Sequence, residues 1–222
     1  MITLGSKRKE LEHIYQLLYK HFGRRHWWPA DTAFEVIVGA ILTQNTAWKN
    51  VEKAINNLKT ANMLSPVKLY SQPISTIAEL IKPSGFYNQK AKRLKLMITF
   101  LVERYNGNIE EMCKKNTVDL RNELLSIKGI GKETADSIIL YACNKPIFVV
   151  DAYTYRIFSR HGLIDKQTDY EEIQEMFMNN LDHDPQLFNE YHALIVETAK
   201  HFCKTKPLCE SCPLSELPRY ID

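Results

Sequence analysis

The sequence feature that most constrains this chain is a glycine-containing turn, Ile127-Lys128-Gly129-Ile130-Gly131-Lys132. Two glycines two residues apart permit a tight turn and let the backbone approach another surface closely. The residues that follow, beginning at Glu133, predict a helix whose first N–H groups point back at the turn. A helix N-terminus preceded by glycines is typical of an anion site, and phosphate is the anion we expect. Apolar residues before the turn, such as Leu124, predict a hairpin held between two helices.

A single carboxylate, Asp151, follows the apolar run Ile147-Phe148-Val149-Val150, one helix beyond the turn. It is expected to cap a helix that starts at Ala152. A second role is compatible with the first, because a carboxylate held by amide donors stays ionised. It can then stabilise positive charge on a substrate or orient a water molecule. A phosphate-binding hairpin with a nearby acid indicates chemistry on nucleic acid.

The remaining chain predicts helices only. Apolar residues recur at helical spacing over 6–22 and 184–202, and residues 34–42 are apolar nearly all round, which indicates a central buried helix. With 222 residues, 45% of them hydrophobic, the chain can bury a substantial core. We find no β-alternation and no repeat, so we expect an all-α fold.

Composition narrows the class of protein further. The net charge of +3 permits a nucleic-acid partner without requiring one. No secretory signal is visible and no apolar run is long enough to span a bilayer, so we expect no membrane association and an intracellular protein. The five cysteines, with Cys113 and Cys143 isolated, do not indicate a disulfide framework.

Three segments each have two interpretations. The loop Trp27-Trp28-Pro29 either packs into the core or forms a surface on which a flat ligand stacks. The polar run Thr43-Gln44-Asn45-Thr46 is either an ordinary helix end or a segment whose side-chain amides are placed at a functional site by the buried helix. The third segment is the start of a helix over 88–105, whose basic residues oppose the helix dipole. These residues form either a solvated face or a site for an external anion; they are Lys90, Lys92 and Arg93.

The run from Lys128 to Asp151 resembles the helix-hairpin-helix, Gly/Pro-rich loop and Asp of the endonuclease III superfamily of DNA glycosylases. Related segments occur upstream in the same order, at 42–46 and 85–91, so the resemblance covers about 34–212. The Trp-Trp-Pro loop and the segment from Ser84 to Leu94 most resemble the monofunctional 3-methyladenine DNA glycosylases. The resemblance implies two helical subdomains with the active site in the groove between them. A six-helix domain at 25–143 ends in the hairpin, and residues 1–24 with 144–222 form the second.

The resemblance also implies roles for individual residues. Asp151 is the expected catalytic carboxylate, Gln44 fills the space left by an extruded nucleotide, and Phe86 wedges into the opposite strand. The hairpin holds a DNA phosphate through the backbone of Gly129, Ile130 and Gly131 with Lys132, and Lys90, Lys92 and Arg93 hold others. The base pocket is expected to be lined by Trp27, Trp28, Pro29 and Trp48.

One catalytic position departs from the bifunctional members of the family. They carry a lysine immediately before the Thr-Ala of this helix, where this chain has Glu133, with Lys132 on another face. Without that amine, strand cleavage lacks its Schiff-base route. We therefore expect a hydrolase that removes an alkylated purine, 3-methyladenine-like, from double-stranded DNA, and that acts as a monomer in the nucleoid-containing cytoplasm. The alternatives are a lyase for oxidised pyrimidines using Lys132, a mismatch-specific thymine glycosylase, and a non-catalytic damage-binding protein.

The last departure concerns Cys203, Cys209 and Cys212, which read C-x5-C-x2-C. The family's [4Fe–4S] loop has four cysteines spaced C-x6-C-x2-C-x5-C, and Pro218 stands at the position of the fourth. Three thiolates complete neither a cluster nor a zinc site, and His201 is a further ligand candidate only by proximity. Two interpretations stay open, a metal-free remnant and a cluster with a non-cysteine ligand.

Overall fold

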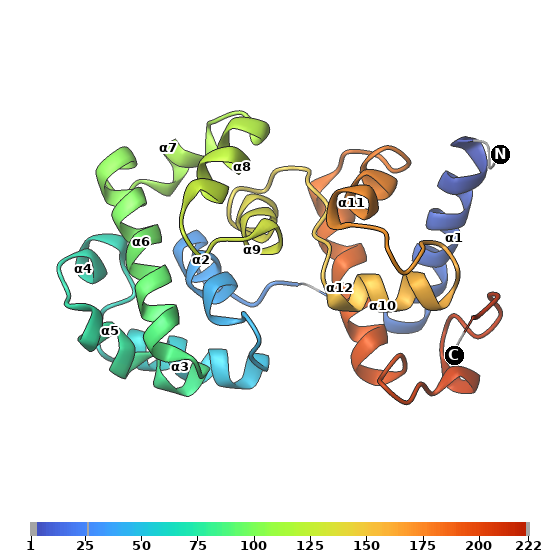
Figure 1. Cartoon of the computed structure of the whole chain (residues 1–222), viewed down its shortest axis with the longest axis horizontal. Helices are drawn as coiled ribbons and strands as arrows, with labels where there is room; N and C mark the ends of the chain where they lie inside the picture. The colour runs from blue at the N-terminus through green and yellow to red at the C-terminus, as the bar shows by residue number, and fades with distance from the viewer. Residues whose placement is uncertain (1–3, 26, 221–222) are drawn as a thin grey trace. The chain divides into compact units, whose positions relative to one another are not determined.

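A computed structural model describes residues 4–25 and 27–220. The chain divides into two compact units (Figure 1). Unit 1 comprises Met1–Trp27 and Pro146–Asp222, and unit 2 comprises Trp28–Lys145. The divisions expected from sequence, after residues 24 and 143, lie close to these boundaries. The described residues form no β-strand, so the all-α prediction is confirmed.

Unit 2 is built around α2 (Ala33–Leu42), whose residues 34–42 are all buried. Thr32 caps this helix by accepting a hydrogen bond from the Glu35 amide. The described residues of this unit form eight α-helices, where the resemblance implied six. The other elements are α3 (Trp48–Thr60), α4 (Pro66–Tyr70), α5 (Ile74–Leu80), the 3₁₀ turn η1 (Lys82–Ser84), α6 (Tyr87–Tyr105), α7 (Ile109–Cys113), α8 (Thr117–Ser126), α9 (Lys132–Ser137) and the π-helical η2 (Ile138–Ala142).

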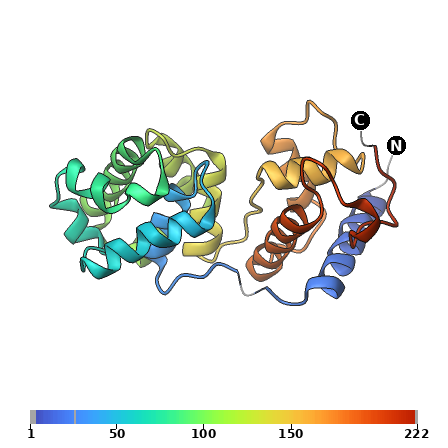
Figure 2. The ribbon, with the colours of Figure 1, turned by 90° about the horizontal axis from the view of Figure 1, so that it is seen from below.

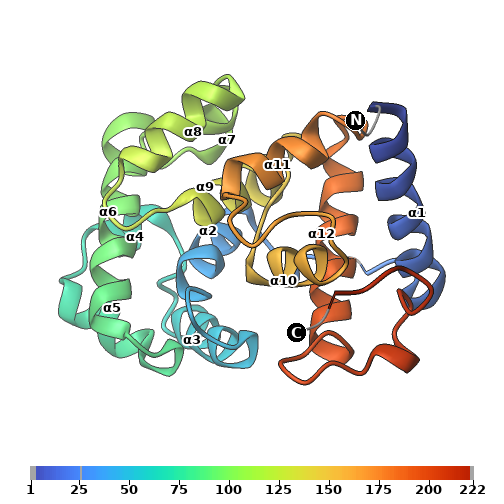
Figure 3. The ribbon, with the colours of Figure 1, turned by 45° about the vertical axis from the view of Figure 1, so that its right-hand side comes forward.

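Unit 1 is organised around α12 (Pro185–His201), which carries ten buried residues along its length. The helix α1 (Leu4–Phe22) lies beside it, as the blue and red ribbons in Figure 2 show, and the Tyr191 hydroxyl donates to the Leu11 carbonyl at 2.9 Å. Phe148 stacks on Phe177 with ring centroids 3.7 Å apart. Figure 3 shows the remaining helices, α10 (Ala152–Arg160) and α11 (Tyr170–Met178); a 3₁₀ turn, η3 (Cys209–Ser211), follows α12.

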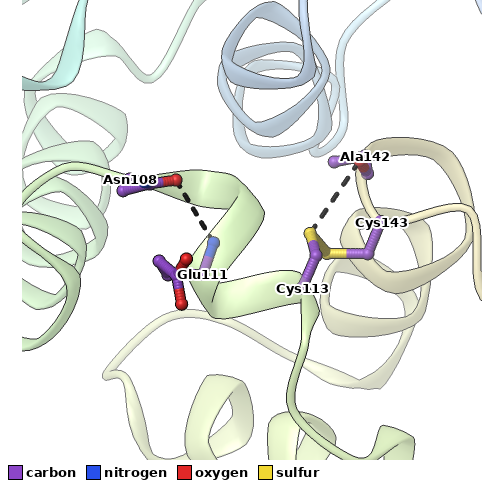
Figure 4. Close-up of a disulfide and its surroundings, with 5 residues drawn as sticks. All are labelled: Asn108, Glu111, Cys113, Ala142 and Cys143. Atoms are coloured by element: carbon purple, nitrogen blue, oxygen red, sulfur yellow. Dashed lines mark hydrogen bonds between the residues drawn. A yellow bond between two sulfur atoms is a disulfide. The ribbon is translucent and has the colours of Figure 1, made fainter.

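A disulfide corrects one expectation from the sequence. Cys113, at the end of α7, is bonded to Cys143, directly after η2, with Cα atoms 5.1 Å apart (Figure 4). Isolated cysteines give no sign of such a pair, because their proximity is created only when the chain folds. The crosslink encloses the whole hairpin, since the two cysteines are 30 residues apart and flank it. Within the described residues, no helix combines the length and apolar character needed to cross a membrane.

Candidate functional site

The predicted hairpin is present between α8 and α9. Its turn is closed by the Ile130 amide, which donates to the Ile127 carbonyl at 3.0 Å. Gly129 has a φ of +93°, a conformation that other residues rarely adopt. Gly131 is the N-cap of α9 and supplies no side-chain cap to the helix amides. The Ile130 backbone was expected to bind a DNA phosphate. Its N–H is instead used inside the turn, and the residue, which is 5% exposed, anchors the hairpin with its side chain.

Gln44 and Arg93 join the hairpin to other parts of unit 2. The Gln44 side-chain amide donates to the Gly129 carbonyl at 3.2 Å and to the Thr134 hydroxyl at 3.0 Å. The Arg93 guanidinium in turn donates to the Gln44 side-chain oxygen. The arginine stem also packs on the turn, because a Cβ added at Gly129 would lie 2.5 Å from the Arg93 Cγ. The structure thus brings together three residues that lie far apart in the sequence.

Phe86 stands at the start of α6 with its side chain 67% exposed. Its φ of +46° is left-handed, and Gly85 before it has a φ of +64°. Asn45, beside Gln44, is left-handed too, with a φ of +52°. Such conformations in non-glycine residues cost free energy and concentrate at functional sites. Two loops that each carry a predicted DNA-contacting residue therefore share this backbone feature.

Lys90 is not on a basic face, which corrects its predicted role as a phosphate ligand. The residue is 1% exposed. Its ammonium donates to the carbonyls of Leu42 and Ser84, both at 2.7 Å, and to the Thr46 hydroxyl at 2.6 Å. Burial, together with the neighbouring Arg93, lowers the pKa of Lys90 to about 8. All three ammonium protons are used inside the protein, whereas Lys92 of the same helix is exposed.

The residues of the predicted base pocket divide between the two units. In unit 2, Trp28 meets Trp48 edge to face, with centroids 5.2 Å apart, and lies 5.0 Å from the ring of Tyr141. The absence of a side chain at Gly39 makes room for Trp28, since an added Cβ would lie 3.3 Å from its ring. Pro29 is exposed in this unit. Trp27 belongs to unit 1, where the Lys200 ammonium lies 4.9 Å from the centre of its ring.

Tyr141 is an aromatic member that the sequence reasoning missed. It lies in η2, within the apolar run after the hairpin, where a tyrosine is expected in a core. The Trp48 indole N–H donates to Glu52 at 3.0 Å, which fixes the orientation of its ring. An aromatic cluster of Trp28, Trp48 and Tyr141 is therefore assembled within unit 2.

Asp151 caps α10, as the sequence predicts. Its carboxylate accepts from the Thr154 amide at 2.7 Å and from the Thr154 hydroxyl at 2.9 Å. The Asp151 amide in turn donates to the Thr154 hydroxyl at 3.5 Å, which completes a capping box. The His192 imidazole lies 3.5 Å from the other carboxylate oxygen, and the two side chains, of Asp151 and His192, are 13% and 7% exposed. Burial favours the neutral acid, but His192 and Thr154 outweigh it and hold the pKa of Asp151 below its usual range.

His192 is the second functional candidate that the sequence reasoning missed. A signal for it exists, because it is a titratable residue inside the buried stripe of α12, between Tyr191 and Ala193. Its partner Asp151 is remote in sequence, so the pairing itself appears only in the fold. Lys132 and Glu133 both lie exposed in the first turn of α9. These are the residues on which the choice between hydrolysis and Schiff-base lyase chemistry was expected to depend.

The C-terminal cysteines do not fit the iron–sulfur ligand set. Cys203, Cys209 and Cys212 line one small pocket of unit 1, but across residues 4–25 and 27–220 no three His, Cys, Asp or Glu side chains are arranged to hold a metal ion. Burial raises the pKa of the Cys212 thiol, which disfavours the thiolate that iron or zinc binds. The carbonyl of Pro218, at the position of the fourth cysteine, is instead hydrogen-bonded to His161 Nδ1 at 2.8 Å.

Protein contacts tie this loop to the rest of unit 1. The Arg160 guanidinium donates to the Lys204 carbonyl at 2.6 Å, to the Thr205 carbonyl at 3.2 Å and to the Cys203 sulfur at 3.3 Å. The Tyr220 amide donates to the Arg160 carbonyl at 2.7 Å. The segment after α12 is thus tied to the end of α10 through one arginine.

Comparison with known proteins places this arrangement in a family. Residues 38–183, which include the hairpin and Asp151, match the family model described as "HhH-GPD superfamily base excision DNA repair protein". The chain belongs to this superfamily, and within it to the DNA glycosylases related to endonuclease III. The family suggested by the sequence motifs is confirmed.

Individual relatives are similar over nearly their whole length. A Methanocaldococcus jannaschii protein named "Putative DNA repair glycosylase" is 55% identical over 95% of this chain and 96% of its own. Endonuclease III of Thermotoga maritima is 32% identical over 91% of this chain and 89% of its own. Among solved structures, an H. pylori 3-methyladenine DNA glycosylase bound to 1,N6-ethenoadenine is 33% identical, with a TM-score of 0.74, over 87% of this chain and 97% of that one.

Proposed function

We propose that this DNA glycosylase is monofunctional: it hydrolyses the N-glycosidic bond of a damaged base and leaves the strand intact. One observation carries the proposal: the chain has both a largely buried Asp151, whose pKa is held below its usual range, and a glutamate at position 133. The ionised carboxylate can stabilise positive charge on the sugar or orient the attacking water during hydrolysis. Glu133 occupies the position at which the bifunctional relatives bear their Schiff-base lysine, and a carboxylate cannot form an imine.

DNA binding in this proposal belongs to the exposed residues of unit 2. The backbone of Gly129 and Gly131 at the hairpin, with Lys132, binds one phosphate, and the exposed Lys92 binds another. Ile130 contributes by anchoring the turn. Phe86 enters the base stack at the lesion, and Gln44 takes the place of the extruded nucleotide. The interactions gained offset the cost of unstacking, which is on the order of a few kcal/mol.

The chemical step uses the charge of Asp151. As the base departs, positive charge develops on the deoxyribose, and a fixed carboxylate stabilises it or orients the attacking water. Thr154 holds one carboxylate oxygen, and His192 lies beside the other. Both are positioning residues, because they keep the carboxylate ionised and its orientation fixed.

The substrate we propose is an alkylated purine of the 3-methyladenine type. Such a base carries positive charge, and the faces of Trp28, Trp48 and Tyr141 would attract it by about 0.5–2 kcal/mol per contact. Trp27 is not assigned this role, since its ring already faces the Lys200 ammonium. The similarity to the H. pylori 3-methyladenine glycosylase supports the same class of base. A cationic base is a good leaving group, so a strong general acid is not required.

A bifunctional enzyme is the second candidate, favoured by the exposure of Lys132 and by the relative named endonuclease III. Borohydride trapping on a duplex with an abasic site separates the two. We expect no covalent adduct with the wild-type protein. An adduct that disappears in Lys132→Met would overturn the monofunctional proposal and assign the amine.

A further inference from the structure

We propose that Lys90 is a positioning residue that fixes the loop carrying Gln44 and the loop carrying Phe86 relative to each other. The inference rests on the proposed function, in which both loops enter the DNA stack. Lys90 itself does not touch DNA.

The geometry places the Lys90 ammonium at the meeting point of the two loops. On one side it donates to the Leu42 carbonyl, at the end of α2, and to the Thr46 hydroxyl, two residues after Gln44. On the other side it donates to the Ser84 carbonyl, two residues before Phe86. The Thr46 hydroxyl also donates to that same carbonyl at 2.6 Å, so the two loops are linked twice at one point.

The electrostatics argue against an ordinary stabilising ion pair. The three acceptors are two carbonyls and a hydroxyl, none of which carries a charge. The charged group that acts on Lys90 is Arg93, a second cation on its own helix, while the end of α2, the 43–46 loop and η1 present it with neutral groups. Burying a cation without a counter-ion costs free energy, and the pKa lowered to about 8 reflects that cost.

A group retained at such a cost has a use other than stability. A nucleophilic role is excluded by burial, because Lys90 is 1% exposed and all its protons are engaged. The left-handed Phe86 shows what the bonds maintain on one side, because a bulky residue rarely holds this conformation without support from its surroundings. An ammonium is suited to this task, because it donates three bonds from one atom.

The test measures insertion of the loops into DNA. The probe is a duplex with a stable abasic analogue and a neighbouring 2-aminopurine, whose fluorescence rises when the stack is opened. We expect Lys90→Met to weaken the insertion equilibrium by about fivefold or more, as the loss of hydrogen bonds worth about 1 kcal/mol implies. Its thermal stability should stay near that of wild type, because an uncompensated buried charge is removed.

The matched control is Lys95→Met. Lys95 also lies on α6 and donates to two carbonyls, those of Tyr70 and Gln72, but neither belongs to a DNA-contacting loop. This variant should change insertion by less than about twofold. If Lys90→Met and Lys95→Met have equal effects on insertion, the positioning role is wrong.

Three further measurements keep the test decisive. Phe86→Ala must abolish the fluorescence change; if it does not, the proposed insertion is itself wrong, whatever Lys90 does. Should Lys90→Met fail to fold, Thr46→Val removes the shared hydroxyl, and we expect it to weaken insertion about threefold. In the wild type, insertion should also weaken as the pH rises through about 8, where Lys90 loses its proton. Unchanged insertion both in Thr46→Val and across this pH range would overturn the inference.

Discussion

Lys90 in unit 2 is fully buried and Asp151 in unit 1 largely so, but their surroundings have opposite effects on the charged form. Asp151 has an imidazole and two donors from Thr154, which keep its pKa below the usual range in spite of burial. Lys90 has neutral acceptors and a neighbouring cation, so burial prevails and lowers its pKa to about 8. In the proposed function, Asp151 keeps its charge for the chemical step, whereas Lys90 uses its charge to position two loops.

The largest effect should come from removing the charge of Asp151. Asp151→Asn preserves a good N-cap, so the fold should be kept. We expect single-turnover base release to fall about a thousandfold, since electrostatic and acid–base contributions are of this order. Binding to an abasic-analogue duplex should change by less than about twofold.

The matched control for this variant is Asp169→Asn. Asp169 caps α11 in the same unit with the same kind of capping box, but it is exposed and lies outside the proposed chemistry. It should release base at the wild-type rate. Equal losses in the two variants would mean that capping, and not the charge of Asp151, supports catalysis.

The next effect is on the stability of unit 2 alone. Cys143→Ser opens the crosslink that encloses the hairpin, and for a loop of this length we expect a loss of about 3.5 kcal/mol in the free energy of unfolding. Urea denaturation measures it, with Cys209→Ser as the control because Cys209 is a free thiol. Identical unfolding curves for Cys143→Ser and wild type would show that the disulfide does not form in solution.

A smaller effect should follow from His192→Gln. The carboxylate loses a partner that lowers its pKa, so the pKa of Asp151 should rise and the acid limb of base release should move to higher pH. The stability that the depressed pKa provides is present above the unfolded value of about 3.9 and is lost as pH falls through the folded value. Single-turnover rates from about pH 4 to 8, on the order of tenfold slower at the acid end, measure the shift.

His201→Gln is the control for that profile. His201 lies on the same helix but is exposed and pairs with Glu197 at 3.4 Å. Its pH profile should match that of the wild type. If His192→Gln also leaves the profile unchanged, the imidazole does not maintain the charge of Asp151.

The smallest effect concerns the metal question in unit 1. If protein contacts hold the C-terminal loop, a chelator should leave thermal stability unchanged, and Arg160→Met should lower it by about 1–2 kcal/mol through loss of hydrogen bonds. Iron and sulfide analysis of the purified protein completes the measurement. Stoichiometric iron that stabilises the protein would contradict the metal-free reading of this loop.

The sequence predicts what local rules decide. The buried α2, the hairpin and the Asp151 cap all follow from residue spacing and capping chemistry. The charge of Lys90 does not predict that its side chain is buried. Its spacing from Leu94 and Met97, however, puts it on the buried face of α6. A charged side chain therefore predicts exposure less well than the helical period does at this position.

Contacts between remote segments were not predictable in the same way. Three contacts join residues that are distant in the sequence and meet only when the chain packs. They are the Cys113–Cys143 bond, the Asp151–His192 pair and the Gln44 bond to Gly129. A single sequence contains the members of these pairs but no sign of the pairing. The use of the Ile130 amide inside the turn likewise depends on the conformation of the turn itself.

The most direct test of the central claim is a panel of damaged duplexes, scored for base release and strand cleavage before and after alkali. We predict release of 3-methyladenine, no release of thymine glycol, and strand cleavage only after alkali treatment. Cleavage without alkali, or release of thymine glycol in place of 3-methyladenine, would contradict the monofunctional assignment.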